Sequence, residues 1–179
     1  MAALLRLSAM SDRMTEFVGR TLYWLILVMV LISTLNAISR KFLSVSSNAW
    51  LELQWYLFSV VFLCCAGYAL LRKEHIRIDI VASHLSERAN QRIALFGHVF
   101  FLVPLCVIMI WVSWPYLMES IRLNEVSSNA GGLVRWPAKL IIPVGFALLL
   151  LQGISEIIKQ VGVMRGVYVD PRTPPPQQH

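Results

Sequence analysis

The dominant pattern along the chain is an alternation of long apolar stretches without charges and shorter segments that carry the charges. The charge-free stretches cover residues 21–39, 53–71, 93–118 and 140–155. A bilayer core of about 30 Å needs about 20 helical residues to cross it, and backbone groups in lipid must hydrogen-bond within their own segment. The pattern therefore predicts an all-α integral membrane protein with four transmembrane helices, at about 21–39, 51–71, 93–118 and 138–158.

The same pattern divides the chain into three parts. Residues 1–20 repeat apolar side chains such as Leu7, Met10 and Met14 at helical spacing between charges, which predicts an amphipathic cytoplasmic segment. Alternatively, residues 1–20 are the first turns of one long first helix. Residues 21–160 form the transmembrane domain, whose first stretch exceeds the apolar region of a cleaved signal peptide. Residues 161–179 end in a proline-rich sequence, which predicts a disordered cytoplasmic tail.

Capping residues refine the helix boundaries. In the charged segment between the second and third helices, Asp79 is a suitable N-cap and predicts a short interfacial helix after it. Ser86 can cap the third helix in the same way. Pro137 falls in the first turn of the fourth helix, where a missing N–H costs little.

The composition supports a membrane protein, and the distribution of charge predicts its orientation. Hydrophobic residues make up 57% of the chain and charged residues 15%, with a mean hydropathy of +0.63. These values exclude an ordinary soluble enzyme and a disordered chain. The net charge of +6 is not gathered into a basic face, so we expect no nucleic-acid partner. Eleven of the 16 Lys and Arg residues fall on the side of the two termini, which predicts that both termini are cytoplasmic.

Polar residues inside or near the spans are the candidates for specific contacts. Helices joined by a short loop are neighbours, so Glu52 could pair with Arg40, either as a headgroup-level salt bridge or within a docking surface. Lys159 is placed to neutralise a carboxylate one turn before it. Side chains of this kind more often join helices than bind ligands. The candidates for helix packing are Asn36, His98, Gln152 and Glu156.

The sequence offers no catalytic or cofactor site. It contains no phosphate-binding glycine loop and no zinc-protease motif. The three cysteines lie in apolar stretches and lack the spacing of a metal-binding or disulfide motif, which argues against a disulfide framework or a zinc site. A single deep histidine gives no axial pair for haem. We therefore expect a protein without enzymatic activity, cofactor or metal.

Motifs at several places resemble the small membrane subunit of tripartite ATP-independent periplasmic (TRAP) transporters, the DctQ type. They are in register with the four predicted helices and together span roughly residues 21–160. They comprise Asn36 with Arg40 and Phe42, WLELQW at 50–55, GY at 67–68, HIRID at 75–79, NAGGLVRWPAK at 129–139 and IPVGF at 142–146.

The resemblance implies a function that the residues alone do not. In this family a periplasmic binding protein captures an organic acid, and a large elevator-type membrane subunit moves it with sodium. The small subunit is a non-catalytic scaffold that binds and stabilises the large permease subunit in the bacterial inner membrane. It also helps to dock the periplasmic substrate-binding protein.

These roles suggest interface residues rather than catalytic ones. For the periplasmic docking face we expect charged residues at the outer helix ends, with headgroup anchoring as the alternative: Arg40, Lys41, Glu52, Arg122, Glu125 and Arg135. An inner-loop motif should fix the turn and contact the large subunit or membrane lipids, through His75, Arg77 and Asp79.

Two other classes stay open from the residues. A self-sufficient four-helix transporter acting as a homodimer would have enough helices, although it should carry a carboxylate deep in a span. A haem-binding membrane electron-transfer subunit would show a Soret band.

Overall fold

A computed structural model describes residues 1–44, 47–72 and 86–170 and is helical almost throughout. Its helices are α1 (Ala2–Leu43), α2 (Asn48–Cys64), α3 (Ala66–Arg72), α5 (Glu87–Gly97), the π-helical turn η1 (His98–Leu102), α6 (Val103–Arg122) and α7 (Trp136–Met164). Four helical stretches in the described residues are long and apolar enough to cross a membrane: Ala3–Leu43, Asn48–Arg72, Arg88–Arg122 and Trp136–Met164. The all-helical architecture with four such stretches is thereby confirmed.

Each of the four spans extends beyond the range predicted for it, by residues that flank the apolar stretch on both sides. Residues 2–20 are the first half of α1, so the described chain has one continuous first helix. The Ser86 hydroxyl accepts a hydrogen bond from the Ala89 N–H at 3.3 Å and caps α5, as predicted. Pro137 lies in the first turn of α7, also as predicted. The predicted interfacial helix after Asp79 lies outside the described residues.

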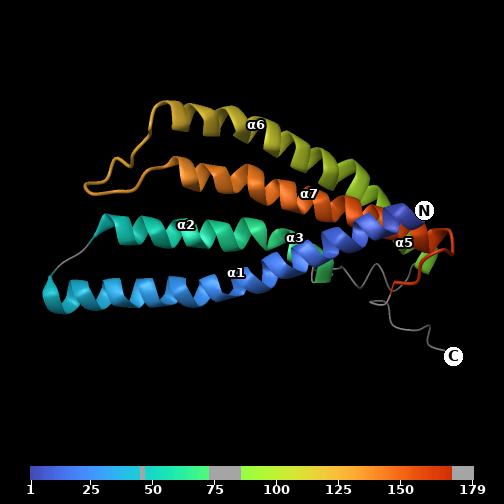
Figure 1. The fold of residues 1–179 in the computed structure, drawn as a ribbon, viewed down its shortest axis with the longest axis horizontal. Helices are drawn as coiled ribbons and strands as arrows, with labels where there is room; N and C mark the ends of the chain where they lie inside the picture. The colour runs from blue at the N-terminus through green and yellow to red at the C-terminus, as the bar shows by residue number, and fades with distance from the viewer. Residues whose placement is uncertain (45–46, 73–85, 171–179) are drawn as a thin grey trace.

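The four spans form a broad layer in the order α1, α2, α7, α6 (Figure 1). Near its N-terminus α1 crosses α3 and reaches α7. One edge of the layer, which we call the loop end, carries the end of α1, the start of α2 and the loop 123–135 between α6 and α7. The opposite edge, which we call the terminal end, carries the start of α1, α5 and the end of α7.

Close packing within the layer depends on glycines more than on large apolar side chains. A Cβ on Gly145 of α7 would lie 2.6 Å from Leu63 Cβ, and a Cβ on Gly19 of α1 would lie 2.4 Å from the Tyr68 ring. Small residues of this kind let membrane helices approach closely. The buried apolar side chains of the described residues are few: Cys64, Leu70, Leu71, Cys106 and Leu117.

The third span is irregular where it enters the layer. In η1 the Val103 N–H bonds the carbonyl of His98, five residues back, and Pro104 follows directly. Proline has no N–H for the carbonyl four residues before it, so a widened turn at this point has an identifiable cause. His98 opens the widened turn and is half-buried.

Candidate functional site

The strongest polar contacts of the described residues gather in two places, one at each end of the layer. The loop-end cluster centres on Glu52 and Glu125. The terminal-end cluster centres on Asp12, Glu156 and Lys159. Between them the spans present mainly apolar side chains to their surroundings.

At the loop end, Glu52 holds the loop 123–135 onto the start of α2. Glu52 is only 6% exposed, and its carboxylate accepts three hydrogen bonds from that loop. The donors are the Ser127 hydroxyl, the Asn129 side-chain amide at 2.9 Å and the Leu133 N–H at 2.7 Å. Charge-assisted bonds to several donors make this carboxylate the anchor of the loop.

The loop itself is a short hairpin shaped to fit that carboxylate. Val126 and Val134 pair as an antiparallel bridge, and the Ser127 N–H bonds the Leu133 carbonyl at 2.9 Å. Gly131 has a φ of 70°, which favours glycine. A Cβ on Gly132 would lie 2.5 Å from Ser127 Cβ and 2.9 Å from the Glu52 carboxylate. The two glycines therefore permit the turn and the close approach to Glu52.

Two further side chains of α2 support the hairpin. The Asn48 amide donates to the Ala130 carbonyl at 3.0 Å, and the Tyr56 hydroxyl donates to the Val134 carbonyl at 3.1 Å. Together with Glu52 these residues hold the loop along more than two turns of α2.

Glu125 joins the hairpin to α6 and α7. It forms an ion pair with Lys139, accepts the Ser120 hydroxyl at 2.8 Å, and lies 3.6 Å from Arg135. The hydrogen bond from Lys139 and that from Ser120 hold the pKa of Glu125 below its ordinary value. The Lys139 ammonium also lies 3.8 Å from the centre of the Tyr116 ring. Glu125 is therefore an anion fixed between two helices.

The residues expected on a docking face divide into two groups. Glu52 and Glu125 are engaged inside the loop-end cluster, and the expected pairing of Glu52 with Arg40 is wrong for the described residues. The neighbouring-helix argument brought the helix ends together but could not foresee that the distant loop would supply better donors. The remaining four are exposed cations at the same end: Arg40, Lys41, Arg122 and Arg135.

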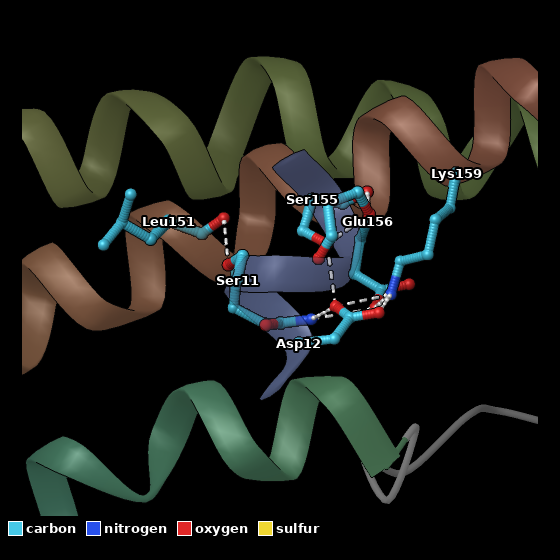
Figure 2. Close-up of polar contacts among 8 residues, drawn as sticks. Ser11, Asp12, Leu151, Ser155, Glu156 and Lys159 are labelled. Carbon is cyan, nitrogen blue, oxygen red and sulfur yellow. Dashed lines mark hydrogen bonds and ion pairs between the residues drawn. The ribbon is translucent and has the colours of Figure 1, made fainter. Parts of the chain in front are cut away.

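At the terminal end, Asp12 of α1 meets a polar face of α7 (Figure 2). Its carboxylate accepts hydrogen bonds from Ser155 at 2.8 Å, from Gln152 at 3.0 Å and from Lys159 at 3.0 Å. Lys159 also pairs with Glu156 at 2.5 Å. One ammonium group thus lies between two carboxylates, with its side chain only 4% exposed.

Hydroxyl groups extend this contact toward the start of α1. The Ser8 and Ser155 hydroxyls lie 2.7 Å apart, and the Ser11 hydroxyl donates to the Leu151 carbonyl at 3.3 Å. Ser8 and Ser155 are both 2% exposed. Small hydroxyl side chains at the crossing let the two helices approach while their polar atoms remain paired.

The Gln152 amide donates a hydrogen bond to Glu156 at 3.1 Å, and Glu156 is the carboxylate one turn before Lys159 that Lys159 neutralises. The sequence reasoning missed Asp12, Ser8 and Ser155. Their signal is the repeat of small polar residues on one face of α1, at Ser8, Ser11 and Thr15, which marks a close helix contact.

The other candidates are placed without a specific function. Asn36 is half-buried on α1, and its contribution to packing stays a prediction, as does that of His98. The motif of His75, Arg77 and Asp79 lies outside the described residues. Among the described residues no group of three His, Cys, Asp or Glu could hold a metal ion.

A layer of apolar helices whose polar clusters lie at its two ends defines a multi-pass membrane protein. A comparison with known protein families narrows this class to one family. The family described as "Tripartite ATP-independent periplasmic transporters, DctQ component" matches residues 29–162, and the chain belongs to it. The protein is therefore a non-catalytic subunit of a TRAP transporter, which functions with other components. No curated protein and no solved structure matches the chain.

Proposed function

We propose that this DctQ component is the fixed scaffold of a sodium-driven TRAP transporter for organic acids. In this proposal it binds and stabilises the large elevator-type permease subunit, and it helps to dock the periplasmic substrate-binding protein. The observation that carries the proposal is the separation of polar ends from apolar sides. In the most apolar stretch of each of the spans Ala3–Leu43 and Arg88–Arg122, only 6% of the residues are buried.

The exposed sides favour a partner made of helices. Large side chains remain uncovered along the layer, such as Phe62, Phe100 and Trp111, which are 68%, 62% and 76% exposed. A broad apolar layer can cover the static helices of a large subunit, while its outer face contacts lipid. Substrate and sodium sites then belong to that large subunit.

The loop end supplies the surface for the periplasmic binding protein. The hairpin bound to Glu52 and Glu125 is a rigid platform, and the exposed cations Arg40, Lys41, Arg122 and Arg135 lie at the same end of the layer. Exposed cations of this kind steer an acidic partner and set the rate of association more than the affinity. Glu52 and Glu125 contribute by holding the platform rather than by contact.

This arrangement requires a defined orientation in the bacterial cytoplasmic membrane. The loop end faces the periplasm, and both termini face the cytoplasm, where the excess of Lys and Arg belongs. The cytoplasmic segment with His75, Arg77 and Asp79 then fixes the turn between the second and third spans and contacts the large subunit or anionic lipid.

The first test is affinity purification of the C-terminally tagged chain from its native membranes. A large polytopic permease recovered in constant ratio would support the scaffold function. Recovery of the chain alone as a stable self-associated species would contradict it. Docking is tested in the assembled transporter with Arg40→Glu and Arg135→Glu, which should slow binding-protein association and reduce its salt dependence. Arg165→Glu, an exposed change at the terminal end, is the matched control and should leave association unchanged.

A further inference from the structure

A pocket at the terminal end lies between α1 and α3. It is lined by Arg13, Arg20, Arg72, Glu16, Phe17 and Leu71, with Asp12 at its edge. We call it the arginine pocket. It shares Asp12 with the terminal-end cluster, and its other lining residues belong to neither of the clusters described above.

The walls of the arginine pocket are held in place by a network centred on Glu16. One carboxylate oxygen of Glu16 accepts hydrogen bonds from Arg20 at 2.8 Å and from Arg72 at 2.5 Å. Arg72 also donates to the Tyr68 hydroxyl at 3.1 Å and lies over the Tyr68 ring. Tyr68 in turn packs directly on Gly19 of α1. The two guanidinium groups are therefore positioned before any ligand arrives.

The pocket carries an excess of positive charge. Three arginines line it, and two of them, Arg20 and Arg72, pair with the same carboxylate, Glu16. Asp12 lowers the excess only in part, because it shares Lys159 with Glu156, and the three arginines with Lys159 still outnumber Glu16, Asp12 and Glu156 by one charge. Arg13 takes part in none of the ion pairs formed among the described residues and is exposed. Each guanidinium has five N–H donors, so donors remain for an anion beyond those bound to Glu16 and Tyr68.

The level of the pocket identifies the anion. Arg72 is the last residue of the span Asn48–Arg72, and Arg20 directly precedes the charge-free stretch 21–39. The arginines therefore lie at the edge of the apolar band on two helices, which is the level of lipid headgroups. Phe17 is 71% exposed beside them, and its ring offers an apolar surface to an acyl chain. Arginine is suited to bidentate bonding of phosphate.

We propose that the arginine pocket binds the headgroup phosphate of an anionic phospholipid and joins α1 to α3 through it. Basic pockets between helices are known to accept such headgroups. This site is separate from the scaffold function, since it requires only the full chain and a bilayer. A bound lipid would hold the crossing of α1 over α3 in addition to the direct contacts.

The test measures phosphatidylglycerol binding to the full chain by native mass spectrometry, at constant ionic strength and against phosphatidylcholine. We expect one saturable phosphatidylglycerol, with binding about fivefold weaker in Arg20→Gln and about 25-fold weaker in the double variant Arg13→Gln/Arg20→Gln. Arg6→Gln is the matched control, because it removes the same charge from an exposed position of α1 outside the pocket. It should change binding less than twofold.

Three outcomes would overturn the proposal. Equal weakening by Arg6→Gln would show a general effect of surface charge. Displacement of phosphatidylglycerol by millimolar inorganic phosphate would assign the pocket to a free anion. Equal retention of phosphatidylcholine would exclude a site for an anionic lipid. The melting temperature of each variant without lipid is measured first, and Arg13→Gln alone, at an exposed residue, serves if the double variant does not fold.

Discussion

Glu52 and Leu133 stand 81 positions apart in the chain, yet the Glu52 carboxylate accepts the Leu133 backbone N–H at 2.7 Å. All three partners of this carboxylate act as donors, and all three belong to the hairpin 123–135. The contact therefore joins the second span to the connection between the third and fourth spans.

Glu52→Gln should destabilise the protein because an amide cannot replace both carboxylate oxygens. Its NH₂ group would face either the Leu133 N–H or the Asn129 amide, so one of these donors would lose its acceptor in either orientation. We expect the melting temperature in detergent to fall by about 5 °C. Glu119→Gln is the matched control, since Glu119 is exposed and, within the described part of the chain, pairs only with Arg122 of its own helix. An equal fall in both variants would contradict the anchoring of the hairpin by Glu52.

The loop end should loosen in acid through Glu125. Its pKa lies below the ordinary value of 4.5 in the folded protein, so its contribution to stability is complete above that pH and is lost as the pH falls through the lowered pKa. We expect the melting temperature to fall less between pH 6 and pH 3.5 in Glu125→Gln than in the wild type. Glu119→Gln should keep the full acid dependence. A Glu125→Gln profile identical to the wild type would refute this linkage.

Gly145→Ala should separate α2 from α7. The new methyl group would lie 2.6 Å from Leu63 Cβ and 3.0 Å from the Leu63 backbone carbon, so the helices must shift. Overpacking of this kind costs about 1–3 kcal/mol. Gly97→Ala is the control, because nothing lies within 4 Å of a Cβ there, and alanine favours the helix. Unfolding in mixed detergent micelles measures both. A neutral Gly145→Ala would contradict the close packing at this point.

Lys159→Met should destabilise the crossing of α1 over α7 strongly. It would leave Asp12 and Glu156 close together, with Glu156 buried and no cation between them, at a cost of about 3–5 kcal/mol. The double variant Asp12→Asn/Lys159→Met should recover part of that loss, because one of the two charges is removed. A double-mutant cycle by chemical unfolding gives the coupling. Additive effects would mean that the Asp12–Lys159 pair carries no interaction energy.

The sequence was sufficient to predict the four spans, since each rests on a charge-free stretch and local capping. Ser86 and Pro137 mark helix starts by chemistry that acts over a few residues. Gln152, Glu156 and Lys159 could also be related, because they lie one turn apart on a single helix. These features share one property: the residues that determine them are close in the chain.

The remaining contacts depend on relations that no local pattern encodes. The rule that short loops join neighbouring helices predicts Arg40 as the partner of Glu52, but its partners are Ser127, Asn129 and Leu133, whose positions depend on how the hairpin folds back. Asp12 was missed because its contacts require α1 to cross the layer and meet α7. The serines at that crossing were visible in the sequence, although their partner helix was not.

The unbroken course of α1 has a mechanical consequence. A helix of 42 residues is about 63 Å long, roughly twice the hydrocarbon thickness of a bilayer. Even at a steep tilt such a helix projects well beyond the hydrocarbon on at least one side. Asp12 and Lys41 are then about 44 Å apart along its axis. α1 is therefore a long stiff helix, so that a change of its tilt at the loop end also displaces its N-terminus.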